Sequence, residues 1–69
     1  MKKVLKLISK DIAKYEANLY MCVKQGDLQK DEAETILMLY LLLNYSGMLE
    51  MEVIEGIKNH FLESLVEEF

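Results

Sequence analysis

The sequence predicts an all-α fold, a compact up-down-up three-helix bundle that is expected to associate as a dimer. Few residues break helices, because the 69-residue chain has no proline and only three glycines. Eight apolar residues run without interruption from Ile36 to Leu43. Such a run is too long to alternate like a half-buried strand, and Glu32, Ala33 and Glu34 before it favour a helix. A helix that is apolar on all sides needs cover on all sides, and we expect the flanking segments to supply part of it.

The chain length allows one domain, residues 1–69. A chain of this size buries only about 60% of the surface that its unfolded form exposes, so its core alone gives marginal stability. Cys22 is the only cysteine and His60 the only histidine, which excludes an internal disulfide and the usual structural zinc site. The remaining sources of stability are oligomerisation and close helix packing.

Residues 2–24 are predicted to form the first helix, with a lysine-rich side opposite an apolar seam. This pattern indicates a core-facing stripe with a solvated basic face. The alternative is a basic amphipathic helix on an anionic membrane, but the seam could not then cover the apolar run. The seam residues recur at spacings of three and four: Leu5, Ile8, Ile12, Tyr15, Leu19 and Cys22.

Residues 30–45 are predicted to form the second helix, with Gln29 as its N-cap and Glu32 at the third helical position. At 100° per residue, one arc faces the neighbouring helices and another faces outward. Two helices cannot cover both arcs, so the excess predicts contact with another chain. The inner arc is Ala33, Ile36, Leu37, Tyr40 and Leu43, with Leu41 at its margin. The outer arc continues into Met38, Leu39, Leu42 and Tyr45.

Residues 49–67 are predicted to form the third helix. Gly26 and Gly47 mark the two turns, where glycine commonly ends a helix. Short turns make neighbouring helices antiparallel. The inward stripe is Met51, Ile54, Ile57, Phe61 and Leu65, with Leu62 and Phe69 beside it. The outer face is Glu52, Asn59, Glu63 and Glu67.

Charge is unevenly distributed along the chain. Residues 1–24 hold six lysines and two acids, whereas residues 25–69 hold ten acids and two lysines. The net negative charge and the absence of arginine from the sequence argue against direct nucleic-acid binding. No apolar stretch approaches the roughly 20 residues of a membrane span. Lys6 and Lys10 interrupt the apolar N-terminus, so we expect no signal peptide and a cytoplasmic location.

Candidate catalytic groups are few, and we expect no enzyme activity, no cofactor, no metal and no small-molecule substrate. Cys22 lies on the apolar seam and is interpreted as a core residue, and His60 as a boundary residue. The remaining enzyme hypothesis is a magnesium-dependent all-helical nucleotide hydrolase, in which Asp31 and Glu34 would face Glu52 and Glu55 across two helices.

The sequence therefore predicts a non-enzymatic interaction module that self-associates, with a homodimer as first choice, or docks on another protein. The alternative is a small acidic, phage-type inhibitor that mimics nucleic-acid charge and blocks a host nucleic-acid-binding or defence enzyme. The predicted partner-binding residues are on the outer side of the second helix, joined by two from the first: Met38, Leu39, Leu42, Tyr45, Tyr20 and Met21.

Overall fold

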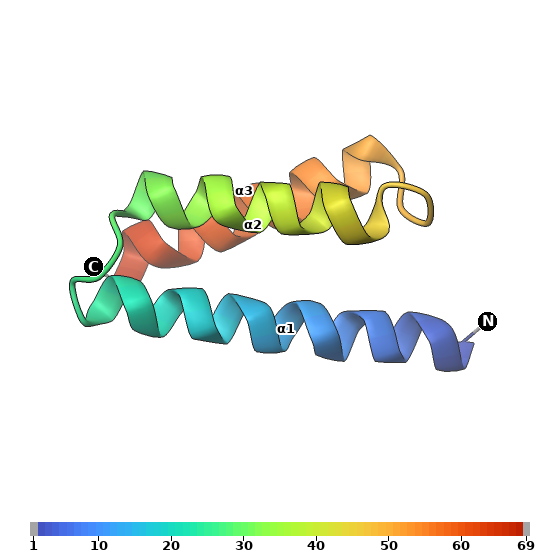
Figure 1. Cartoon of the computed structure of the whole chain (residues 1–69), viewed down its shortest axis with the longest axis horizontal. Coiled ribbons are helices and arrows are strands. Elements are labelled where there is room, and N and C mark those ends of the chain that lie inside the picture. Colours follow the sequence, from blue (N-terminus) through green and yellow to red (C-terminus); the bar gives the residue numbers. More distant parts are fainter. Residues whose placement is uncertain (1, 69) are drawn as a thin grey trace.

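Three helices account for most of the chain in a computed structural model that describes residues 2–68. They are α1 (Lys2–Lys24), α2 (Lys30–Tyr45) and α3 (Met51–Glu68). The bounds of the first two agree with those predicted, and α3 begins two residues later than expected. Successive helices are antiparallel, so α1 and α3 run in the same direction (Figure 1). The all-α, three-helix, up-down-up prediction is confirmed. The radius of gyration is 12.0 Å, near the value of about 11 Å typical of a compact chain of this length.

The core is centred on α2 and is densest between α2 and α3. The four largest fully buried side chains all come from these two helices. Among the described side chains of α1, only Ile12 and Leu19 are buried, and α2 packs more extensively against α3 than against α1. α1 is therefore the peripheral helix. The buried residues are Ile12, Leu19, Ala33, Leu37, Leu41, Ile54, Phe61 and Leu65.

The buried side of α2 is rotated from the predicted arc toward α3. Leu41, placed at the margin by the sequence pattern, is fully buried, whereas Leu43, placed inside, is 83% exposed. The buried line Ala33, Leu37, Leu41 advances in steps of four and faces the helix with which α2 shares more contact. The prediction of Leu43 as an inner residue is therefore wrong.

Two further core predictions fail at the end of the bundle where α1 begins. Leu5 is 54% exposed and Met51 is 50% exposed. Here the first turns of α1 and the α2–α3 turn enclose an apolar hollow of about 250 Å³ instead of closing on each other. Its lining is Val4, Leu5, Ile8, Met48 and Leu49. Phe69, predicted beside the α3 stripe, lies outside the described residues.

The glycines in the two turns have different backbone conformations. Gly26 adopts a φ of +84°, and its amide donates to the Val23 carbonyl while the Asp27 amide donates to the Cys22 carbonyl, at 3.1 and 2.9 Å. This pair of bonds is the Schellman motif, which ends α1 at a left-handed residue. Gly47 does not adopt a positive φ, so the second turn does not require a left-handed glycine.

The start of α2 confirms the expected partner of its N-cap. The Gln29 amide donates to the Glu32 carboxylate at 2.9 Å, as the spacing of a capping box predicts. This bond satisfies one amide at a helix end, where the first four lack intrahelical acceptors.

Candidate interaction surfaces

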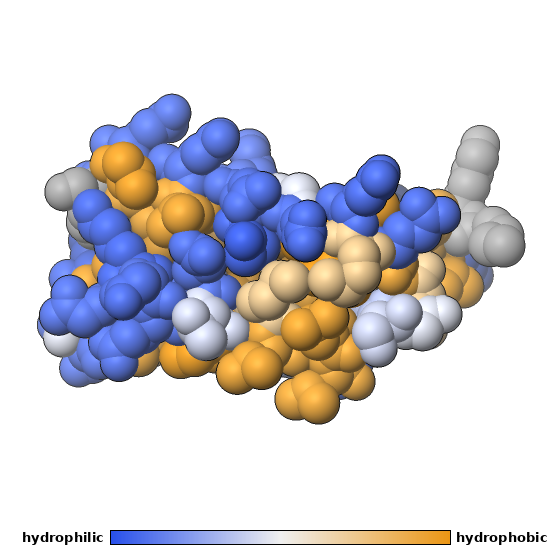
Figure 2. Space-filling view, turned by 90° about the horizontal axis from the view of Figure 1, so that it is seen from above, coloured by the Kyte–Doolittle hydropathy of each residue, from blue (hydrophilic) through white to orange (hydrophobic). Residues whose placement is uncertain are grey.

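The outward side of α2 carries exposed leucines, and we call Met38, Leu39, Leu42 and Leu43 the α2 outer face. Leu39 is 53% and Leu43 is 83% exposed. Met38 and Leu42 are half-buried and pack against the edge of the core. Seen from above, hydrophobic side chains gather along the lower edge of the molecule, over α2, while hydrophilic ones dominate the left half (Figure 2). The face is apolar, but its residues differ in how freely a partner could reach them.

Tyr45 does not belong to this face, although the sequence pattern placed it there. It is half-buried, and its hydroxyl donates a hydrogen bond to Asp11 on α1. Tyr40 donates to the same carboxylate oxygen at 2.6 Å. The Tyr40 ring stacks on Tyr15 with centroids 3.7 Å apart and meets Tyr45 edge-on at 6.2 Å. Asp11, Tyr15, Tyr40 and Tyr45 therefore form one cluster, the Asp11 cluster, which joins α1 to α2.

Hydrogen bonding perturbs the proton affinities in this cluster. The bonds from Tyr40 and Tyr45 hold the pKa of Asp11 below its usual range, because they stabilise the carboxylate. The same bonds favour the neutral phenols: the pKa of Tyr40 is raised to about 12, chiefly by its bond to Asp11. The pKa of Tyr45 is raised for the same reason. The arrangement is a structural polar contact between two helices.

Tyr20 and Met21, predicted to join the α2 surface, lie on a different side of the molecule. Both line a hollow of about 420 Å³ between α1 and α3. Burial raises the pKa of the Tyr20 hydroxyl, and the Glu68 carboxylate beside it raises that pKa further. The structure therefore separates these two residues from Leu39 and Leu42.

A second hollow of about 430 Å³ continues the first along the same two helices. Glu16 and His60 line both hollows, so the two hollows are adjacent. We call them together the α1–α3 groove. Burial raises the pKa of Glu16 above its ordinary value, and the neighbouring His60 partly offsets this rise. Small and apolar residues form most of the remaining lining: Ala13, Ala17, Phe61, Ile12, Gly56 and Ile57.

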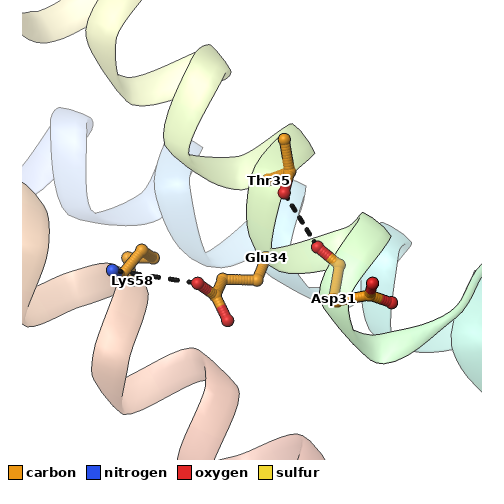
Figure 3. A network of polar contacts seen from close by, with 4 residues as sticks. All are labelled: Asp31, Glu34, Thr35 and Lys58. Carbon is orange, nitrogen blue, oxygen red and sulfur yellow. Dashed lines mark hydrogen bonds and ion pairs between the residues drawn. The ribbon is translucent and has the colours of Figure 1, made fainter.

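The acidic pairs do not face each other. Asp31 and Glu34 lie at the start of α2 and Glu52 and Glu55 at the start of α3, which the antiparallel topology places at opposite ends (Figure 1). Figure 3 shows the Asp31 and Glu34 carboxylates pointing apart. Glu34 lies 3.8 Å from the Lys58 ammonium, and the Asp31 carbonyl accepts from the Thr35 hydroxyl at 2.9 Å. The facing pairs required by the hydrolase hypothesis are therefore not formed.

The remaining candidate groups and the helix lengths are described for residues 2–68. Over that range, no group of three or more histidine, cysteine or acidic side chains is placed to hold a metal ion. Cys22 is half-buried with a free thiol, and His60 is exposed at the groove. None of the three helices, as described, has the length and apolar character to cross a membrane.

Sequence patterns missed Asp11 and the groove. Asp11 and Tyr15 are four residues apart and share one side of α1, a signal that could have marked a polar contact with a tyrosine of α2. The groove depends on how far α1 stands from α3, which the periodicity of neither helix specifies. Comparison with known proteins adds no assignment, since no family model, no curated protein and no solved structure matches the chain.

Proposed function

We propose that this protein is a non-enzymatic protein-interaction module that docks on another protein chain through the α2 outer face. The observation that supports this role is the exposure of Leu39 and Leu43 on the most central helix. Burying apolar surface yields about 25 cal/mol per Å², and an adaptable Met38 beside rigid leucines suits a contact surface. The occupant is a second copy or a different protein.

A photo-crosslinking amino acid at position 43 tests the proposal in cells that express the protein. We expect the 43-probe to form one dominant covalent adduct with a protein, and Leu39→Glu in the same chain to abolish it. A probe at Asn59, exposed on the polar side of α3, is the matched control. Equal adducts from both probes, or none from position 43, would contradict the proposal.

A second candidate function is the charge-mimicking inhibitor. It is favoured by the exposed row Glu52, Glu63 and Glu67 along α3, since a line of carboxylates can occupy a surface built for phosphates. Purified protein should then compete with duplex DNA for the nucleic-acid enzyme it blocks, and added salt should weaken the competition. Glu63→Gln with Glu67→Gln should reduce it, whereas Leu43→Glu should not.

A further inference from the structure

The α1–α3 groove has walls of opposite charge. α1 contains six lysines against Asp11 and Glu16, and α3 contains five glutamates against Lys58. The helices therefore carry formal charges of +4 and −4. The floor between the two helices is largely apolar, although Glu16 and His60 line both hollows. A surface that is positive on one side and negative on the other is complementary to itself when turned over.

The charges stand at the rims of this groove. Lys6 precedes Ala13 by seven residues and Lys24 follows Ala17 by seven, so each lies on the groove side of α1. On α3, Glu67 follows His60 by seven residues and Glu52 precedes Gly56 by four. All four charged side chains are exposed: Lys6, Lys24, Glu52 and Glu67.

The charged rims also match in height along the bundle. At one end, Ser9 of α1 and Val53 of α3 line the same hollow. At the other end, Met21 of α1 and Ser64 of α3 line the same hollow. Lys6 and Glu52 therefore belong to one end, and Lys24 and Glu67 to the other.

Charge selects the symmetry with which two grooves can meet. α1 and α3 run in the same direction (Figure 1). A two-fold axis parallel to them places α1 of one copy against α3 of the other, so lysine meets glutamate. A two-fold axis across them places α1 against α1, so lysine meets lysine, which costs affinity. Ala13, Ala17 and Gly56 project little from the groove floor, so the helices of a second copy can approach it closely.

We propose that the α1–α3 groove binds a second copy of this chain, as a two-fold dimer in which α1 of each copy lies against α3 of the other. The dimer leaves the α2 outer face free to dock on a different protein. This inference stands independently of the proposed function, because the groove lining contains no residue of α2.

Charge reversal tests the dimer by analytical ultracentrifugation. The natural chain should dimerise, and Lys6→Glu with Lys24→Glu should raise the dimer Kd by about tenfold or more, because glutamate then meets glutamate. Glu52→Lys with Glu67→Lys should do the same. An equimolar mixture of the two variants should form a heterodimer, since every rim contact is then complementary.

A matched pair of variants tests the groove floor. Ala17→Glu places a carboxylate in the groove and should dissociate the dimer, whereas Asn18→Glu, at the exposed neighbouring position, should not. Circular dichroism confirms that each variant keeps its helix content. A natural chain that stays monomeric at high micromolar concentration overturns the inference. So does a dimer that survives the reversals and dissociates with Leu43→Glu, but that result would support docking through the α2 outer face.

Discussion

The Asp11 carboxylate accepts a 2.6 Å hydrogen bond from the Tyr40 hydroxyl, joining α1 to α2 across 29 residues of sequence. Ile12 and Leu19 of α1 are buried in the core, and partly buried α1 residues such as Ile8 and Val23 pack against it. This polar contact therefore adds to the apolar contacts that fix α1 against its neighbour. Bonds to a charged acceptor are stronger than those between neutral groups. The position of α1 therefore depends on both polar and apolar contacts.

We expect Tyr40→Phe to lower the free energy of unfolding and Asp11→Ala to lower it as well. The double variant should lose less than the two single losses together, because each change removes the same bond. Chemical denaturation followed by circular dichroism measures all three values.

Tyr15→Phe is the matched control for this cycle. It keeps the ring that stacks on Tyr40 and removes a hydroxyl that does not bond Asp11 within the cluster. Its effect should add to that of Asp11→Ala. Strict additivity for the Tyr40 pair would show that the Asp11–Tyr40 bond does not stabilise the fold.

Stability should fall in strongly alkaline solution. The folded-state pKa of Tyr40 is about 12, above its ordinary value of about 10. Between those values the unfolded chain releases this proton while the folded chain keeps it, so the free energy of unfolding decreases as pH rises. Denaturation from pH 9 to 12 should show this decline, with a smaller slope in Tyr40→Phe. Equal slopes in the natural chain and in Tyr40→Phe would contradict the raised pKa of Tyr40.

In acidic solution the free energy of unfolding should change in the opposite direction, decreasing as pH falls. The folded-state pKa of Asp11 is lowered, so its stabilising contribution is present above the ordinary carboxyl pKa and is lost as pH falls through the lowered value. In Asp11→Asn this part of the acid dependence should disappear. A variant with an unchanged acid profile would show that Asp11 does not contribute to it.

Local patterns predicted the parts of this fold that depend on neighbouring residues in sequence. The bounds of α1 and α2, the Gln29–Glu32 cap and the end of α1 at Gly26 each follow from residues within one or two turns. The side of α2 that is buried did not follow, because it depends on the relative contact with α1 and α3. For this reason Leu41, expected at the margin of the inner arc, is fully buried, and Leu43, expected inside, is exposed.

The candidate surfaces were predicted only in part for the same physical reason. Leu39 was expected outside and is exposed. Tyr45 instead points to α1, because its hydroxyl donates a hydrogen bond to the Asp11 carboxylate. The spacing of apolar residues predicts which side of a helix is apolar. It does not predict which polar group of a neighbouring helix faces that side. Tyr20 and Met21 were expected to join the α2 surface, but they line the α1–α3 groove, because their position depends on the spacing between α1 and α3.

Two glycine-to-alanine changes should shift stability in opposite directions. Gly26 has a φ of +84°, a conformation that costs an alanine about 1–2 kcal/mol, so Gly26→Ala should destabilise by that amount. Gly56 lies within α3, and a Cβ there would meet nothing within 4 Å. Gly56→Ala should therefore stabilise by about 1 kcal/mol, because alanine has the higher helix propensity.

Thermal or urea denaturation of the two variants measures these shifts, at a concentration where the chain is monomeric so that the groove is unoccupied. Gly47→Ala is the intermediate control: Gly47 lacks a positive φ and has open space around its Cβ position, so its effect should lie between the other two. A stabilised Gly26→Ala would show that α1 does not need a left-handed residue to end. A destabilised Gly56→Ala would show that other residues pack against Gly56 in the monomer. The groove floor would then not be open to a second copy, as the dimer requires.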